Sequence, residues 1–534
     1  MTRHAALEAL GDRVFDLLVI GGGITGCGIA RDAALRGLSV ALVEQSDFAS
    51  GTSSRSSRLV HGGVRYLEHG QIHLVFESSA ERRRLLRLAP HLVRPLEFTW
   101  PVYVGARIPQ WKLSAGLTLY DVLALFRNVG RHHRLNRAGV VEAEPMLEPT
   151  GLVGGATYFD ASTNDARLTL ANAIGAVEAG AVVVNHCAVE SMLIDGGRVV
   201  GARVHDFSTD THIDVRASVV VNATGPWSDD VRALSEPVSN AVRGSKGVHI
   251  AVPRERIGNR SALTLLSPHD ERVFFVLPAQ SHAIVGTTDT FSGGAPDEAR
   301  ATNDDVRYLL EAANRFFPRA ALTPNDIVAT WAGIRPLIAS HGSTPNAASR
   351  EHAVATSASG VVSITGGKLT TYRVMAADVI KEVLRRLGRR RGVDPTLTAP
   401  LPGGDFKSLA GVSAAAARTM GDVDLAAHLS TTYGTRWPRV WAEIDRSEGR
   451  PRVVEELPYR FGELRYAVQH EMALSLGDLL IRRTHIAFET RDQGASVAEH
   501  VADAVAPLLS WDALARARAL DAYAREIART FSID

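Results

Sequence analysis

The chain has 534 residues, too many for one compact hydrophobic core, so two or three domains are expected. Charged residues make up 22% of the sequence and hydrophobic residues 45%, proportions that are typical of a folded globular protein and exclude extensive disorder. The net charge of +1 excludes a dedicated nucleic-acid binder, whereas a small anionic ligand needs only a local cluster of basic residues.

The cysteine content and the absence of long apolar runs indicate the cellular location of the protein. Cys27 and Cys187 cannot form a disulfide framework and have no metal-ligand spacing, which suits a reducing cytoplasm and predicts no metal site. The first residues lack the order of a secretory signal, and no apolar run reaches the ~18 residues that cross a bilayer. We therefore expect a cytoplasmic protein in which any membrane contact is peripheral, on the inner face of the cell membrane.

The first predicted elements form a β-α-β unit. An apolar run over 14–20 predicts a buried strand, three glycines follow, and 24–36 is typical of a helix. Gly37 ends this helix, and 39–43 predicts a second buried strand.

A glycine pattern lies at the turn between the first strand and the helix. Gly21 permits a tight turn, Gly23 allows close approach of a pyrophosphate, and Gly26 allows the helix to pack on the strand. Glu44 ends the second strand, where its carboxylate can accept hydrogen bonds from a ribose diol. Together these residues predict a Rossmann-like dinucleotide-binding domain.

The next segment, 51–57, is rich in hydroxyl groups and backbone donors. These groups suit a tightly held cofactor, although a hydroxyl-rich surface loop has the same composition. Two later segments favour the cofactor: a strand over 219–221 that leads into Thr224 and Gly225, and a predicted hairpin that ends at 286–289.

Residues 107–126 are the segment best suited to a membrane interface. Lys112 and small polar residues alternate there with large apolar ones, and such a helix can lie flat on a bilayer. The alternative is a helix that packs on its own domain, and the sequence leaves both open. The apolar residues are Trp111, Leu113, Leu117, Leu119 and Leu123.

The rest of the chain contains further predicted strands, a predicted domain boundary and a helical tail. Segments broken by proline and glycine fill 100–155, and strands are expected at 182–184, 273–277, 282–285 and 360–364, which suggests one sheet interrupted by insertions. A helix is expected to begin near Leu369. The stretch 394–404 is predicted to be a domain boundary, and 409–534 is typical of helices.

Several motifs in order resemble one family. The glycine turn, TSSRSSRLVHGGVRYLE over 52–68, NATGPW over 222–227, GTTD over 286–289, GIRPL over 333–337 and GGKLTTYR over 366–373 are similar to those of the FAD-dependent sn-glycerol-3-phosphate dehydrogenases. The resemblance extends from about residue 16 to 396 and continues more weakly into the tail. It implies an α/β protein: a Rossmann-like FAD-binding domain over 1–395, with an inserted α+β substrate domain built on a mixed or antiparallel sheet (about 78–160 and 240–350), and an all-α C-terminal domain over 396–534.

Chemistry and resemblance together predict an active site. Oxidation of an alcohol by a flavin needs a base for the hydroxyl proton, and His61 suits this role because imidazole titrates near neutral pH. A phosphate dianion needs cationic side chains, for which Arg65, Arg335 and Arg350 are the candidates. The resemblance implies that Tyr66 and Lys368 also line the substrate pocket. We expect Arg335 near the reacting oxygen, where it also stabilises developing charge, and Arg350 at the distal phosphate.

The loop 366–371 joins a strand to a helix, so its backbone N–H groups are expected to face the flavin edge that becomes negative on reduction. Two residues depart from the family pattern: Arg58, where lysine is commoner, and Val248, where a hydroxyl is usual. The residues that we expect to contact FAD are Gly21, Gly23, Ile24, Thr25, Gly26, Glu44, Thr52, Ser53, Ser54, Ser57, Arg58, His61, Gly62, Gly63, Val189, Thr224, Gly225, Trp227, Asp289, Gly367, Lys368, Leu369 and Thr370.

The expected reaction is oxidation of glycerol 3-phosphate to dihydroxyacetone phosphate, with hydride transfer to FAD and reoxidation by a membrane quinone. A glycerol-3-phosphate oxidase that uses oxygen is the first alternative. An amine or amino-acid oxidase on the same fold is the second, although the several separated basic residues argue against it, and a flavin-loaded sensor without turnover is the third. A homodimer is expected.

Overall fold

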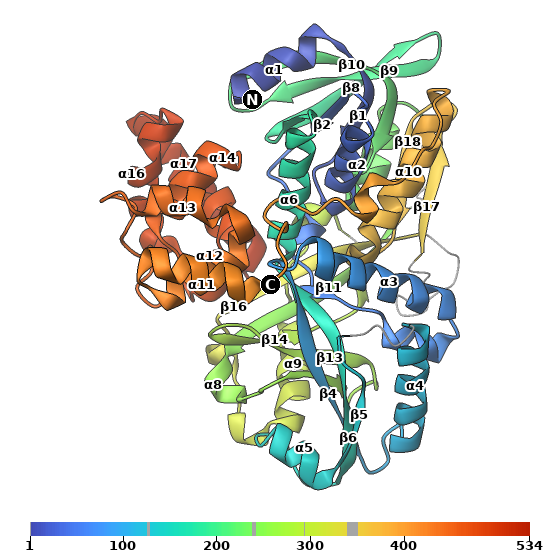
Figure 1. Cartoon of the computed structure of the whole chain (residues 1–534), viewed down its shortest axis with the longest axis vertical. Helices are drawn as coiled ribbons and strands as arrows, with labels where there is room; N and C mark the ends of the chain where they lie inside the picture. Colours follow the sequence, from blue (N-terminus) through green and yellow to red (C-terminus); the bar gives the residue numbers. More distant parts are fainter. Residues whose placement is uncertain (1, 125–128, 238–241, 293, 339–350) are drawn as a thin grey trace.

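The structure is a computed structural model that describes residues 2–124, 129–237, 242–292, 294–338 and 351–534. It has three parts (Figure 1): a sheet flanked by helices, a second sheet, and a helical C-terminal region drawn in orange and red. Arg350 lies outside the described residues, and the side chain of Arg65 is not described.

The first sheet has a parallel centre. Its strands lie in the order β17-β18-β10-β1-β2-β7, and the hairpin β8–β9 joins it through β10. The pairs β1–β2, β1–β10, β2–β7 and β10–β18 are parallel. The strand bounds are β1 (Val14–Ile20), β2 (Val40–Val43), β7 (Val182–Val184), β8 (Cys187–Asp195), β9 (Arg198–Asp206), β10 (Thr211–Asn222), β17 (His352–Thr356) and β18 (Val362–Gly366).

Helices pack against this sheet because it is apolar on both faces. Figure 1 shows α2 and α10 beside β1 and β18, and buried aliphatic residues of both helices share one core with the strands. A second core lies under the first helix of the chain. The helices of this part are α1 (Arg3–Asp12), α2 (Ile24–Leu35), α6 (Asp165–Glu178), α7 (Ser228–Ala233) and α10 (Tyr372–Arg386).

The second sheet is mostly antiparallel. Its strands lie in the order β15-β11-β14-β13-β12-β4-β6-β3, with β16 on β11 and β5 on β6, and β12–β4 is a parallel pair. The bounds are β3 (Leu59–Val60), β4 (Val93–Tyr103), β5 (His133–Asn136), β6 (Leu152–Thr163), β11 (Val242–Pro253), β12 (Ala262–Leu266), β13 (Val273–Pro278), β14 (His282–Gly286), β15 (Thr290–Phe291) and β16 (Ala329–Ile338). Its helices are α3 (Ile72–Leu88), α4 (Gln110–Leu123), α5 (Arg137–Ala143), α8 (Arg254–Ile257) and α9 (Asn303–Phe316).

The sequence pattern did not reveal the long strands β4 and β6. Pro95 and Pro101 in β4, and Gly154 and Gly155 in β6, are residues that strands seldom contain, so this region was expected to be irregular. The register pairs Pro101 with Gly155, and a Cβ atom on Gly155 would lie 2.5 Å from the Trp100 carbonyl oxygen. Close approach of the two backbones therefore explains this glycine.

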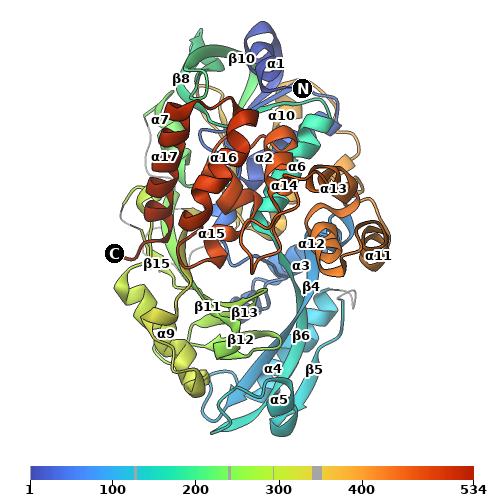
Figure 2. The same cartoon turned by 90° about the vertical axis from the view of Figure 1, so that its left-hand side faces the viewer.

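The C-terminal region is helical, as expected, and it packs against both other parts. Figure 2 shows its helices in front of α2 and α6. Phe488 of this region stacks edge to face on Trp331 of β16, with ring centroids 5.3 Å apart, inside a shared core. The helices are α11 (Leu409–Met420), α12 (Val423–Tyr433), α13 (Trp437–Ile444), α14 (Phe461–His470), α15 (Ile486–Glu489), α16 (Ala498–Leu509) and α17 (Ala513–Phe531).

Candidate active site

The glycine turn between β1 and α2 leaves no room for side chains. Gly21 has φ +106°, and a Cβ atom there would lie 2.8 Å from the Ala223 carbonyl oxygen. At Gly26 a Cβ atom would lie 1.9 Å from the Gly21 carbonyl oxygen. The roles predicted for a tight turn and for close helix packing therefore have a geometric basis.

Glu44 supports this turn from the end of β2. Its carboxylate accepts hydrogen bonds from the backbone N–H of Gly22 at 2.6 Å and of Ser46 at 2.9 Å. Burial raises the pKa of Glu44, and these two hydrogen bonds oppose the increase. The side chain thus positions the glycine turn as well as lining the cavity beside it.

A cavity of about 440 Å³ begins at the glycine turn and ends at the loop after β18. Glycines and the hydroxyl-bearing residues Thr52 and Ser53 are among the residues that line it. The predicted cofactor residues that line it are Gly21, Gly23, Ile24, Thr25, Glu44, Thr52, Ser53, Val189, Thr224, Gly225, Trp227, Gly367, Lys368 and Leu369. Gly26 and Ser54 are buried next to it, whereas Ser57 and Arg58 line a different cavity.

The C-terminal region closes part of this cavity, which the sequence did not indicate. Four of its residues, Ser475, Arg482, Glu526 and Arg529, are among those that line the cavity. The guanidinium group of Arg482 donates to Glu526 at 2.7 Å and to Asp47 at 2.7 Å. Asp47, in the loop after β2, was also missed, because an isolated aspartate after a strand carries no distinguishing pattern.

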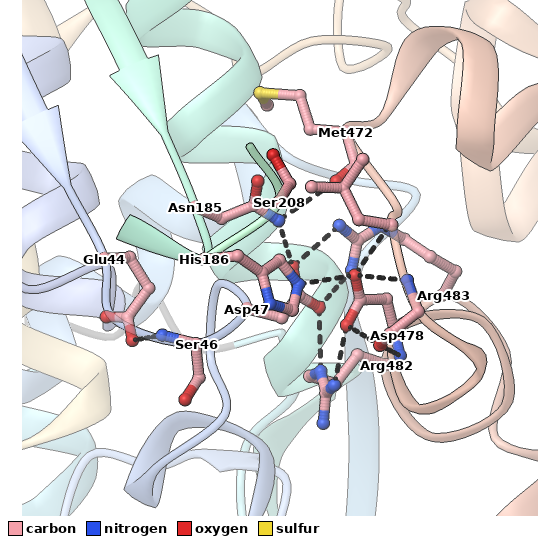
Figure 3. Close-up of polar contacts among 12 residues, drawn as sticks. Glu44, Ser46, Asp47, Asn185, His186, Ser208, Met472, Asp478, Arg482 and Arg483 are labelled. Atoms are coloured by element: carbon pink, nitrogen blue, oxygen red, sulfur yellow. Dashed lines mark hydrogen bonds and ion pairs between the residues drawn. The ribbon is translucent and has the colours of Figure 1, made fainter. Parts of the chain in front are cut away.

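Figure 3 shows the polar cluster around Asp47. Asp478 accepts hydrogen bonds from His186 and Arg482, each at 2.9 Å. Burial alone would raise the pKa of Asp478, but His186 and the neighbouring arginines hold that pKa well below its usual value. Ligand atoms of Asp47, His186 and Asp478 lie within 4.8 Å of one another, yet guanidinium groups already balance both carboxylates. The arrangement is that of an ion-pair network joining two domains.

Three predicted site residues contact one another where Lys368 lines the cavity. The imidazole of His61 stacks on Tyr66, with ring centroids 6.4 Å apart, and the Lys368 ammonium lies 3.8 Å from the centre of the Tyr66 ring. Thr370 bonds to the backbone of His61, at 3.1 Å from the N–H and 3.3 Å from the carbonyl. The loop after β18 thus holds the segment that carries His61.

Gly62 and Gly63 follow His61 because the backbone is crowded there. A Cβ atom on Gly62 would lie 2.1 Å from the Tyr120 hydroxyl, and one on Gly63 would lie 2.3 Å from the Tyr66 ring. The Gly62 N–H donates to Asp160 at 2.8 Å. Their predicted contact with the flavin stays a prediction, but their small size is required by these neighbours.

Arg335 lies on β16, which borders the same cavity through Pro336. Its guanidinium group donates to Asp289 and Thr287, both at 3.1 Å. The hydroxyl of Thr52 donates to the Ile334 carbonyl oxygen at 2.6 Å, so β16 lies against the hydroxyl-rich segment. Arg335 is therefore held in a polar network at the edge of the cavity, with Asp289 as its counter-charge.

Val248, one of the two departures from the family pattern, is buried in the core of the second sheet. The hydroxyl of a neighbouring residue, Thr288, lies beside it and accepts a hydrogen bond from the Val248 N–H at 3.1 Å.

Comparison with known proteins gives two family matches and close relatives. Residues 16–373 match the family described as FAD dependent oxidoreductase, and 395–516 match the C-terminal domain of alpha-glycerophosphate oxidase. A glycerol-3-phosphate dehydrogenase of Mycobacterium leprae (strain TN) is 42% identical over 96% of this chain and 88% of its own length. The chain belongs to the FAD-dependent glycerol-3-phosphate dehydrogenase family.

Other members of the family agree over nearly full length. The aerobic glycerol-3-phosphate dehydrogenase of Staphylococcus haemolyticus (strain JCSC1435) is 35% identical over 96% of this chain and 94% of its own length. The glycerol-3-phosphate dehydrogenase of Bacillus halodurans, solved in complex with FAD, superposes with a TM-score of 0.83 at 33% identity, covering 99% of this chain and 97% of that one. The predicted fold class is confirmed, and so is FAD as the cofactor of this family member.

Proposed function

We propose that the protein oxidises sn-glycerol 3-phosphate to dihydroxyacetone phosphate and passes the electrons to a membrane quinone. The observation that carries this proposal is the contact of His61 and Tyr66 with each other and of Tyr66 with Lys368, a residue that lines the dinucleotide cavity. A base and a cation side by side suit an alcohol that carries a phosphate group. The names of the family members support the same substrate.

FAD, when bound, supplies an acceptor for the hydride that leaves the substrate carbon. The imidazole of His61 takes the hydroxyl proton, because an imidazole group ordinarily titrates near neutral pH. Lys368 supplies positive charge for the phosphate group. Arg335 supplies positive charge for the substrate oxygen that becomes negative as the proton leaves. Tyr66 positions Lys368 through the contact between its ring and the ammonium group.

Arg65 and Arg350 complete the proposed phosphate site. Arg65 is one residue from Tyr66 in the same short turn, and we assign its side chain to the substrate by this position in the family motif. Arg350 is assigned to the distal phosphate as a further cationic side chain.

The proposed acceptor requires contact with a membrane surface. Among the described residues, no helix is both long enough and apolar enough to cross a bilayer. Helix α4 buries Leu113 and Leu117 against its own domain, while Trp111 on its outer side is 72% exposed. Leu119 and Val122 are exposed as well, so α4 packs one face on its own domain and leaves apolar side chains on its outer face. We propose that this outer face lies on the bilayer.

Anaerobic mixing of the FAD-loaded protein with glycerol 3-phosphate tests the substrate. Bleaching of the flavin absorbance by this compound, and not by glycine or other amino acids, is the expected result. Bleaching by an amino acid alone would support an amine or amino-acid oxidase, whose known structures share this fold at low identity, and no bleaching with either would reject turnover of both kinds.

The acceptor is tested on the reduced protein. We expect a soluble quinone to reoxidise the flavin at least about tenfold faster than dissolved oxygen at equal concentration. The reverse order would favour the oxygen-using alternative, consistent with a fold shared with the L-alpha-glycerophosphate oxidase of Mycoplasma pneumoniae (17% identity, TM-score 0.56). We also propose that the protein is a homodimer, which sedimentation would test. We expect it to work at the cytoplasmic face of the membrane.

A further inference from the structure

A second cavity of about 200 Å³ lies where the three parts of the molecule meet. Its walls come from β3 and β6, from the turn between β13 and β14, and from the C-terminal helices. It shares no described lining residue with the cofactor cavity. Residues 52–59 separate the two: Thr52 and Ser53 face the cofactor cavity, whereas Ser57 and Arg58 face the second one.

The second cavity is strongly basic. Its described lining residues include four arginines, Arg58, Arg94, Arg167 and Arg483, but a single carboxylate, Glu489. Arg167 is paired with Glu471 at 2.7 Å, and Arg483 with Asp47 at 2.6 Å, so these two charges are balanced. Arg58 and Arg94 supply the remaining positive charge.

Arg58 is the centre of this arrangement. Its guanidinium group lies between two aromatic rings, 4.6 Å from the centre of Phe488 and 5.3 Å from that of Trp331. Its Nε and Nη2 atoms are buried and find no hydrogen-bond partner in the described part of the chain. Buried donors without a partner are costly, by about 1–3 kcal/mol each, so such atoms usually mark the place of a ligand or water.

The backbone of Arg58 supports the same conclusion. Its φ of +56° is in the left-handed region, which costs a residue with a side chain about 1–2 kcal/mol. The N–H of Thr163 donates to the Arg58 carbonyl oxygen at 2.9 Å and holds this conformation. A strained backbone that directs unpaired donors towards a cavity is typical of a binding site.

The nearby ionisable groups leave the cavity positive. Burial lowers the pKa of His91 to about 3 and keeps the pKa of His485 well below its usual value, so both imidazoles are neutral. Burial raises the pKa of Glu489 to about 7, with Arg58 opposing the increase, so this carboxylate is partly protonated near neutral pH. Neither effect cancels the charge of Arg94. Arg58 also interacts with the buried carboxylate of Asp165, which is not among the residues that line the cavity and whose pKa, raised by burial, Arg58 lowers.

We propose that this cavity binds a small phosphate-bearing anion, held by Arg58 and Arg94, at a site distinct from the active site. Guanidinium groups match the oxygens of a phosphate group, and Ser162 and Gln280 offer further donors along the wall. The volume corresponds to about seven water molecules, enough for inorganic phosphate or a three-carbon phosphate ester. Because the walls come from three domains, a bound anion ties these domains together.

Arg94 is the position at which to test the site. It lies on β4 opposite Ser162, and its side chain is exposed, so replacement does not disturb the core. Arg134 on the neighbouring β5 is also exposed but is not among the residues that line the cavity, and it provides a matched control. The variants are Arg94→Gln and Arg94→Glu, with Arg134→Gln and Arg134→Glu beside them.

Equilibrium dialysis of the FAD-loaded protein with labelled inorganic phosphate, and separately with 3-phosphoglycerate, measures the sites. We expect Arg94→Gln to weaken one site by about 10- to 100-fold, Arg94→Glu to abolish it, and both Arg134 variants to bind like the parent. Tighter binding of 3-phosphoglycerate than of phosphate at that site supports an organic ester, and equal binding supports free phosphate. Identical binding curves for the parent and both Arg94 variants would overturn the proposal.

Discussion

The carboxylate of Asp47 accepts two hydrogen bonds from the guanidinium group of Arg483, at 2.6 and 3.0 Å, although the two residues are 436 positions apart. Both side chains are buried, and Figure 3 shows them facing each other. Arg482 donates to the same carboxylate at 2.7 Å. The loop after β2, which borders the cofactor cavity, is thereby joined to the C-terminal helical region.

Replacement of Asp47 by asparagine tests this junction. Asp47→Asn keeps the shape of the side chain but leaves the buried guanidinium group of Arg483 without its carboxylate partner, a change that typically costs about 3–5 kcal/mol, whereas Arg482 keeps Asp478 and Glu526. We expect a loss of that order in the free energy of unfolding, measured with denaturant, and weaker binding of FAD, measured by the flavin fluorescence released on dilution.

Asp195→Asn is the control for this experiment, since Asp195 is exposed at the end of β8. It should change neither quantity. An Asp47→Asn variant within about 0.5 kcal/mol of the parent would show that the junction contributes little to stability.

The glycine turn gives a second prediction. In Gly26→Ala the new Cβ atom would lie 1.9 Å from the Gly21 carbonyl oxygen, so helix α2 must move away from the strand. We expect purified Gly26→Ala to contain little FAD or none. The ratio of the absorbance at about 450 nm to that at about 280 nm, taken on the folded fraction, measures the flavin content.

Gly116→Ala is the matched control, because Gly116 lies in helix α4 with no atom within 4 Å of the added methyl group. It should bind FAD normally and gain up to about 1 kcal/mol of stability from the higher helix propensity of alanine. Normal flavin content in Gly26→Ala would contradict the proposed packing role.

The proposed base gives a third prediction. His61→Asn should slow flavin reduction by glycerol 3-phosphate by roughly 10²-fold or more while FAD stays bound, because the amide cannot take the hydroxyl proton. Stopped-flow absorbance under anaerobic conditions measures this rate. His133→Asn, at an exposed position on β5, should reduce its flavin at the parent rate. Equal rates for His61→Asn and the parent would remove His61 from the mechanism.

Lys368 gives a fourth prediction, about binding. Lys368→Met removes the ammonium group that lies 3.8 Å from the Tyr66 ring centre and keeps most of the apolar side chain. We expect KM for glycerol 3-phosphate to rise about 10- to 100-fold, with a smaller effect on kcat, because charged hydrogen bonds to phosphate contribute about 1.5–3 kcal/mol. Lys112→Met, at an exposed position of α4, should leave KM unchanged. An unaltered KM in Lys368→Met would place the phosphate elsewhere.

Buried histidines give a fifth prediction, for acid stability. Burial, with Arg335 and Arg58 nearby, lowers the pKa of His249 to about 3. Between pH 6.5 and 3 the unfolded chain therefore binds a proton at this residue that the folded protein does not, so stability falls as the pH falls. His249 contributes a loss of about 1.4 kcal/mol per pH unit within that window.

The comparison of the parent with His249→Gln isolates this contribution. The variant should lose stability less steeply between pH 6 and 4 in denaturant titrations. His282, whose pKa burial lowers to about 4, acts in the same direction in both proteins, and Glu489, with its pKa raised to about 7, acts in the opposite one. Equal slopes for parent and variant would mean that His249 is protonated in the folded protein.

Local patterns allowed much of the first domain to be predicted. The strand over 14–20 is confirmed, and the helix and second strand differ from their predicted bounds by one residue each. These elements follow from short-range physics: continuous runs of apolar residues, the turn glycines, and the positive dipole end of a helix. The strands β4 and β6 were missed because they contain prolines and glycines, which are uncommon in strands. Pairing between these two strands, which local sequence does not reveal, stabilises them despite those residues.

The predicted site residues were also placed with unequal success. His61, Tyr66 and Lys368 were chosen from motifs, and their contacts bring them together, whereas Arg58 was expected at FAD and lines the second cavity instead. Its direction depends on Trp331 and Phe488, which come from two other domains.

The sequence by itself determined the dinucleotide-binding unit and the family, and it supplied the candidates for the proposed active site, because each of these is encoded within a few neighbouring residues. Only the tertiary structure decided that residues of the C-terminal region line the cofactor cavity and that Arg58 and Arg94 line a second one. Ion pairs such as Asp47 with Arg483 depend on packing between domains, and no local pattern specifies which distant charges will meet.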